Sequence, residues 1–162
     1  MSEGSPVALK RANADDLSRC LEIGQRLPDY FNATGLALMA RDVETHGALV
    51  AIRDEELVGF VVAERRGPDV AEILWIAVEP TLFSQGIGSR LVQASLADLR
   101  NQGLRLVEVK TLADTVDYAP YARTRRFWER QGFFLLEVID PYPTWEPGNP
   151  CAIYVHPLQP GR

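Results

Sequence analysis

The stretch from Ala71 to Arg90 constrains the fold most, because it contains a short apolar run, a glycine-containing loop and the start of a helical pattern in that order. The run Ile73–Val78 is rich in β-formers and too short for an isolated helix, which predicts a strand buried on both faces. Pro80 follows and cannot donate a ladder hydrogen bond, so the strand ends before it. Beyond the loop, apolar side chains share one helical stripe at Leu91, Val92, Leu96 and Leu99.

The glycine loop is therefore predicted to lie at a helix N-terminus, where unpaired N–H groups and the helix dipole favour an anion. Gly86 and Gly88 lack a Cβ, so a phosphate could approach their backbone closely. Two other interpretations stay open. The glycines could serve the geometry of a tight turn alone. With Glu108 further on, they also resemble a dinucleotide fingerprint, but Leu91 occupies its third glycine position.

The sequence AEILWIAVEPTLFSQGIGSRL resembles motif A of the GNAT superfamily, the acyl-CoA-dependent N-acyltransferases. Tyr118–Phe133, YAPYARTRRFWERQGF, is similar to motif B of the same superfamily. Phe83 departs from the pattern, since Gln or Arg is usual there. The resemblance implies that acetyl-CoA is the cosubstrate and that backbone groups of one loop hold its diphosphate. That loop comprises Ser84, Gln85, Gly86, Ile87, Gly88 and Ser89.

The resemblance also implies how an acetyl group would move to a primary amine by direct attack. The backbone of Ile76, Ala77 and Val78 would pair with the pantetheine arm, and one N–H there would stabilise the oxyanion. Glu72 would be the general base, with a pKa raised by apolar neighbours. Alternatively, Glu72 points to solvent or pairs with an arginine.

Trp128 occupies the position where motif B often has a tyrosine that protonates the leaving thiolate. An indole N–H is not an acid in this range. Either Tyr121, seven residues earlier on the same helical face, is the acid, or the thiolate leaves unassisted. The chain could also be a CoA-binding sensor or interaction domain that lacks catalysis.

Two further groups of residues have two interpretations each. Tyr30 and Phe31 lie between two predicted helices, where they would either staple the helices together or line the acceptor site. The arginines of motif B form the densest basic patch and would be either a solvated helix face or a source of one CoA phosphate contact. These arginines are Arg123, Arg125, Arg126 and Arg130.

The length of 162 residues suits a single acyltransferase domain over residues 1–162. The formal net charge of -5 argues against a nucleic-acid partner. No apolar run is long enough to span a membrane, and no signal-peptide layout opens the chain, so a cytoplasmic protein is expected. Two cysteines form no disulfide framework, Cys20 is expected in the core, and two histidines suggest no metal site.

Periodicity and turn signals predict a mixed α/β fold, with a sheet of about seven strands and about four helices. The first half of the sheet should be antiparallel and its centre parallel. Thr34 is expected to cap the second helix, and Cys151–His156 to be an edge strand. Exposed edge strands are compatible with a homodimer. Other strands are expected at Val7–Arg11, Ala48–Arg53, Leu57–Arg65, Leu104–Lys110 and Phe133–Ile139.

Overall fold

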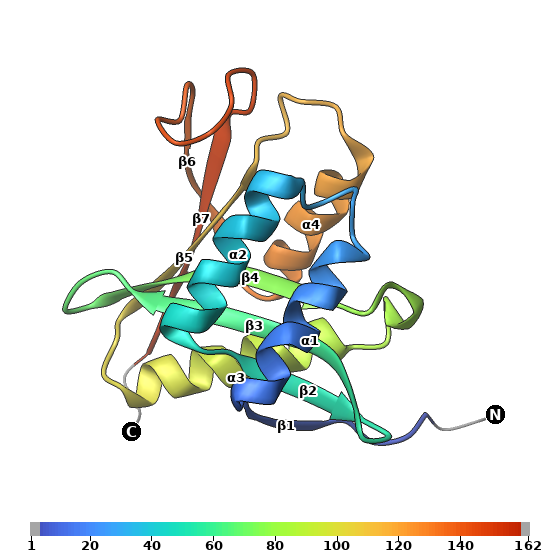
Figure 1. The fold of residues 1–162 in the computed structure, drawn as a ribbon. Coiled ribbons are helices and arrows are strands. Elements are labelled where there is room, and N and C mark those ends of the chain that lie inside the picture. The colour runs from blue at the N-terminus through green and yellow to red at the C-terminus, as the bar shows by residue number, and fades with distance from the viewer. Residues whose placement is uncertain (1–3, 160–162) are drawn as a thin grey trace. The chain divides into compact units, whose positions relative to one another are not determined.

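The computed structural model describes residues 4–159, which form seven strands, four α-helices and one short 3-10 turn, η1 (Figure 1). The strands are β1 (Ala8–Arg11), β2 (Leu49–Arg53), β3 (Glu56–Arg65), β4 (Val70–Val78), β5 (Leu106–Leu112), β6 (Phe134–Ile139) and β7 (Cys151–Pro157). The helices are α1 (Ala14–Gln25), α2 (Ala33–His46), α3 (Ile87–Asn101) and α4 (Ala119–Arg130), and η1 is Pro80–Leu82. Within this part of the chain, every helix is too short or too polar to cross a lipid bilayer.

The strands are hydrogen-bonded in the order β1-β2-β3-β4-β5-β7-β6. Val70–Glu72 of β4 pairs in parallel with Leu106–Glu108 of β5. The β1–β2, β2–β3, β5–β7 and β6–β7 pairs are antiparallel. The predicted mixed sheet, antiparallel at its start and parallel at its centre, is confirmed.

The prediction that Cys151–His156 is an edge strand is wrong. β7 lies between β5 and β6, and its register runs from Leu106↔Pro157 to Leu112↔Cys151. The side chains of Cys151, Ile153 and Val155 are buried accordingly. The flanking prolines suggested an edge, but β6 adds outside β7 and becomes the edge strand instead. Local composition carries no information on that long-range pairing.

The chain forms two compact units. The first comprises the residues up to Glu64 together with Ile73–Ser95, and the second comprises Arg65–Glu72 and the residues from Leu96 onward. β4 and α3 each contribute residues to both units. The glycine loop belongs to the first unit, and Glu72 and motif B belong to the second.

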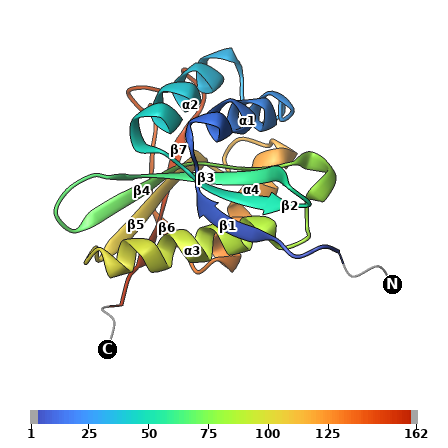
Figure 2. The ribbon, with the colours of Figure 1, turned by 60° about the horizontal axis from the view of Figure 1, so that its bottom comes forward.

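In the first unit, α1 and α2 cover one face of the sheet and the beginning of α3 covers the other (Figure 2). Phe60 of β3 is fully buried among core residues of α1 and α2, which include Cys20 and Met39. Its neighbour Gly59 faces α3, because successive strand residues point to opposite faces. A Cβ at Gly59 would lie 3.1 Å from the Leu91 side chain and 3.1 Å from the Ala77 carbonyl oxygen, so glycine allows α3 to pack closely.

The first two helices begin at asparagine caps. The Asn13 side chain accepts a hydrogen bond from the Asp16 N–H, and the Asp16 carboxylate accepts one from the Asn13 N–H, which completes a capping box. Asn32 caps α2 by accepting from the Gly35 N–H. The prediction that Thr34 is that cap is wrong, because the helix already begins at Ala33.

In the second unit, α4 packs near β5. The Arg125 guanidinium donates a 2.7 Å hydrogen bond to the carbonyl oxygen of Leu112, the last residue of β5. On β7, Cys151, Ile153 and Val155 form a small apolar cluster. Ile139, Tyr142 and Trp145 pack against this cluster, so the proline-rich segment after β6 is tied to the sheet by aromatic side chains.

Candidate active site

The glycine loop connects the 3-10 turn after β4 to the first residue of α3. Ser84 has a φ of 64° and Gly86 a φ of 82°, so the chain turns twice through the left-handed region before the helix begins. The Arg90 N–H donates to the Gly86 carbonyl oxygen at 3.1 Å, which is the first hydrogen bond of α3. In any α-helix the first-turn N–H groups point along the axis away from the helix body, which makes this end attractive to an anion.

The space over Gly86 is open. A Cβ built on this residue would meet no atom within 4 Å, so no side chain fills the region that a phosphate would need. Gly86 itself is exposed, whereas Ile87 is buried and fixes the helix start to the core. The open space at Gly86 and the polarity of the helix N-terminus are therefore compatible with a coenzyme A diphosphate at this loop.

A side chain from β2 anchors the loop. Arg53 Nη1 donates a 2.7 Å hydrogen bond to Gln85 Oε1. Since the Gln85 amide is engaged by Arg53, we expect Gln85 to contribute its backbone to the cradle. Phe83 is 42% exposed at the position that departs from the family pattern. Sequence analysis missed Arg53, because a hairpin-end arginine gives no local sign of its partner.

Glu72 lies inside the second unit and does not point to solvent. It is 6% exposed, and Lys110 Nζ of β5 lies 2.9 Å from its Oε2. Arg66 Nε is 3.5 Å from the same oxygen. Lys110 also lies 3.4 Å from Glu108 Oε1 and 5.9 Å from the centre of the Tyr142 ring. Glu72 is thus the buried member of an ionic cluster in which the Arg66 side chain is about half exposed.

Burial raises the pKa of Glu72 above its ordinary value, although the hydrogen bond and the charge of Lys110 oppose that rise. Burial is the largest single influence on the pKa of Lys110 and lowers it, but the hydrogen bond that Lys110 donates to Glu72 and the nearby negative charges of Glu72 and Glu108 together outweigh burial, so the pKa of Lys110 is raised. The ammonium therefore stays charged at neutral pH. The Glu72 carboxyl therefore has the raised pKa expected of a general base. It also forms the ion pair with an arginine, Arg66, that the alternative interpretation predicts.

Tyr30 and Phe31 join a third aromatic residue in the first unit. Their ring centres are 6.3 Å apart, and Phe31 packs edge-on against Trp75 of β4 at 5.9 Å. Trp75 Nε1 donates a 2.8 Å hydrogen bond to Oδ2 of Asp42, a buried carboxylate of α2. Sequence analysis missed Trp75 and Asp42 here, because their pairing joins residues 33 positions apart.

The sequence pattern of the acetyltransferase (GNAT) family matches residues 12–133, which is most of the chain. This chain belongs to the GNAT acetyltransferase family. Among curated proteins it is similar to the mycothiol acetyltransferase of Brachybacterium faecium, with 35% identity over 89 residues. The match covers 52% of this chain and 25% of that relative, so the chain spans about a quarter of the relative's length.

Two solved structures show the same fold. One is a GNAT-family protein from Desulfovibrio desulfuricans, with a TM-score of 0.84, 23% identity, and coverage of 95% of this chain and 100% of the other. The second is a GNAT-family acetyltransferase from Elizabethkingia anophelis, solved with acetyl-CoA bound. Its TM-score is 0.70 at 17% identity, and the match covers 94% of this chain and 98% of that one.

Two tyrosines lie at the start of α4 in this GNAT chain. The ring centres of Tyr118 and Tyr121 are 5.8 Å apart. Trp128, by contrast, is 4% exposed and packs edge-on against Phe127 and Phe133 at 5.1 and 5.0 Å. The residue at the usual tyrosine position is therefore part of the hydrophobic packing of α4, and the nearest phenol on the same helical face is that of Tyr121, seven residues earlier.

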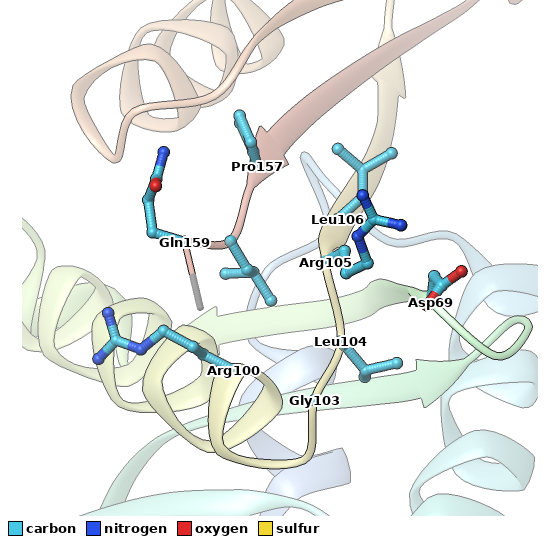
Figure 3. A pocket seen from close by; sticks show the side chains of 9 residues that line it. Asp69, Arg100, Gly103, Leu104, Arg105, Leu106, Pro157 and Gln159 are labelled. Carbon is cyan, nitrogen blue, oxygen red and sulfur yellow. The ribbon is translucent and has the colours of Figure 1, made fainter. Parts of the chain in front are cut away.

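The arginines of α4 lie in two different environments. Arg125 is bound to the end of β5, whereas Arg123, Arg126 and Arg130 are exposed, as expected for a solvated helix face. The chain also has an open hollow at the C-terminal end of α3 (Figure 3). Its lining includes Asp69 and two arginines whose guanidinium groups point in different directions in that view. It contains none of the predicted site residues.

The predicted residues thus fall into separate groups. The first unit brings the loop Ser84–Ser89 into the shape of an anion site and joins Tyr30 and Phe31 to Trp75. Ile76, Ala77 and Val78 lie at the end of β4, in the same unit. The second unit holds Glu72 in its ionic cluster and Tyr121 beside Tyr118.

Proposed function

We propose that this GNAT chain transfers an acetyl group from acetyl-CoA to a primary amine by direct attack. The observation that carries the proposal is the open backbone cradle at Gly86, placed between β4 and α3 in a chain of this family. The solved relative with bound acetyl-CoA supports the choice of cosubstrate. We also infer that residues 1–162 act as a single acyltransferase domain.

The loop residues Ser84, Gln85, Gly86, Ile87, Gly88 and Ser89 bind the diphosphate through their N–H groups in this proposal. The backbone of Ile76, Ala77 and Val78 pairs with the pantetheine arm. Parallel pairing of β4 with β5 covers only the first three residues of β4, Val70–Glu72, which supports a role for the later residues in pairing with a ligand. A backbone N–H in this segment stabilises the oxyanion that forms at the thioester carbonyl.

Glu72 accepts the proton that the attacking ammonium must lose. The amine nitrogen then forms a bond to the thioester carbon, and the carbon–sulfur bond breaks as the coenzyme leaves as a thiolate. Tyr121 donates a proton to that sulfur, or the thiolate departs unassisted, since a thiol pKa of about 8.5 makes it a fair leaving group. Tyr30, Phe31 and Trp75 form an apolar wall suited to the body of the acceptor amine.

A second candidate function has specific support. Glu72 is held by Lys110 and Arg66, and Trp128 is occupied in packing, so the chain could bind acetyl-CoA as a sensor without turning it over. Incubation with acetyl-CoA and a panel of primary amines, following free thiol, separates the two. Thiol release above the hydrolysis background supports transfer. Binding of acetyl-CoA without any acceptor supports the sensor.

A matched pair of glycine variants tests the cradle itself. Gly86 and Gly148 have φ values of 82° and 89°, and a Cβ at either would meet no atom within 4 Å. Gly86→Val and Gly148→Val therefore carry a similar backbone cost, of about 1–2 kcal/mol. We expect only Gly86→Val to weaken acetyl-CoA binding in calorimetry, by about tenfold or more. Equal affinities in both variants would remove the loop from cofactor binding.

A further inference from the structure

The outer strand of the second unit is unusually apolar for an edge. β6 lies at the end of the strand order, and its only strand neighbour among residues 4–159 is β7. Five of its six residues are exposed. Four of the exposed side chains are large and apolar: Phe134 at 54%, Leu135 at 50%, Leu136 at 58% and Val138 at 42%. Because these exposed residues are consecutive or nearly so, both faces of the strand are left apolar.

The opposite end of the strand order is built differently. β1 has four residues, Ala8–Arg11, and two of them are the charged Lys10 and Arg11. Short length and positive charge are the usual protection of an edge against pairing with another chain. β6 has only Glu137 as a charged residue. The chain thus protects the β1 edge by short length and charge, whereas β6 is longer, has one charged residue and is irregular only between Leu135 and Glu137.

We propose that β6 pairs antiparallel with β6 of a second copy of this chain across a two-fold axis. An edge strand has unpaired N–H and C=O groups along its outer side, and an identical antiparallel strand satisfies them from both copies.

The charge pattern favours a register centred on Leu136. In that register Leu136 faces its own copy, Phe134 faces Val138 of the second copy, and Glu137 faces Leu135. A register centred on Glu137 would set two carboxylates directly opposite each other, which destabilises a strand pair. Leu136 is also the residue skipped by the register shift between β6 and β7, which is consistent with its high exposure.

The apolar area is of the size that such pairing needs. Each of the four side chains would hide on the order of 100 Å². Two copies would then bury about 800 Å² from these side chains, and the backbone edges and Glu137 stems bring the total to roughly the 1,000 Å² expected of a specific interface. Because buried area alone does not set affinity, the dimer is best sought over a range of chain concentrations up to about 100 µM.

Sedimentation of the full chain tests the proposal. We expect a mass of about twice 18.1 kDa at high concentration, and a shift to the single mass for Leu136→Lys and for Val138→Lys. Leu38→Lys is the matched control, since Leu38 is a 40% exposed leucine on α2 and its replacement should leave the dimer intact. A monomer at about 100 µM chain overturns the proposal, as does a dimer that survives both β6 variants.

A cysteine introduced at the symmetry axis gives a second readout. Cys20 and Cys151 are both buried, so Leu136→Cys adds the one exposed thiol among residues 4–159. We expect mild oxidation to link two Leu136→Cys chains rapidly, and Leu38→Cys chains far more slowly. Equal rates for the two variants mean random collision, and they would contradict pairing through β6.

Discussion

Glu72 shows how a buried carboxylate can have two interpretations that sequence alone does not separate. A carboxylate in a buried strand has a raised pKa because burial disfavours its charge. The same burial requires a partner, and Lys110 provides it at 2.9 Å. If Glu72 is the base, Lys110 is a positioning residue that sets the pH at which Glu72 can accept a proton.

Replacing Lys110 with methionine should move the acid limb of the pH–rate profile to higher pH. A carboxyl is a base only when ionised, so activity is lost as the pH falls through the pKa of Glu72. Lys110 lowers that pKa by hydrogen bond and charge, and Arg66 lowers it while Glu108 raises it. Without Lys110 the pKa rises further. The profile of kcat/KM against pH measures the shift.

Two further variants show what the shift means. Lys110→Arg keeps the charge and should leave the limb near its original position. Lys10→Met removes another ion-paired lysine, the partner of Asp16, and should not move the limb. A limb that stays in place in Lys110→Met would identify a group other than Glu72 as the titrating base.

Tyr121→Phe tests the second predicted catalytic residue. The phenol is the acid candidate because Trp128 is buried in packing and has no acidic proton. If Tyr121 protonates the thiolate, kcat should fall by about 10²-fold, with little change in KM. Tyr118→Phe, three residues earlier in the chain, is the control. An unchanged rate in Tyr121→Phe would indicate unassisted departure of the thiolate.

At the level of elements, the beginning of α1 illustrates how a local motif stabilises a helix. Asp16 accepts a 2.7 Å hydrogen bond from Lys10 Nζ and another from the Asn13 N–H, and these bonds hold the pKa of its carboxyl below the ordinary value. A group with a lowered folded-state pKa stabilises the fold above its unfolded pKa. That contribution is lost as the pH falls through the folded-state value.

Asp16→Ala should therefore destabilise the chain by about 1 kcal/mol at neutral pH. Asp15→Ala is the control, because Asp15 lies in the same helical turn and is exposed. Urea unfolding of both variants and the wild type, repeated as the pH is lowered below 3.8, measures the effect. The gap between Asp16→Ala and wild type should shrink in acid, and a gap that stays constant would contradict the assigned pKa direction.

At the level of the whole molecule, the two cysteines report on the two compact units. Cys20 is in the first unit and Cys151 in the second, and both are fully buried. Burial raises the pKa of Cys20 to about 12 and that of Cys151 to about 11, so neither forms much thiolate in the folded chain. Labelling of either thiol requires that its own unit opens.

If residues 1–162 are one cooperative domain, both thiols should become reactive together as urea is raised. Mass spectrometry of each labelled cysteine gives the two midpoints, which should coincide within error. Labelling of one cysteine well before the other would show that the units unfold separately and would contradict the single-domain proposal.

Short-range sequence patterns were sufficient to predict the local elements and the family. The order of apolar strand, glycine loop and helix gave β4 and α3, the Asn13 cap gave the start of α1, and motif A with motif B gave the GNAT fold. These depend on periodicity, capping and turn chemistry, which act over a few residues.

Which distant residues contact each other became evident only in the folded chain. In the folded chain β7 lies between β5 and β6, and the apolar side chains of β6 are exposed. Glu72 is bound to Lys110, Gln85 to Arg53 and Trp75 to Asp42. The three side-chain contacts join residues more than 30 positions apart in the chain. The place of β7 and the exposure of β6 depend on the order of strands in the sheet. No local pattern encodes such contacts, because they result from how all the elements pack together.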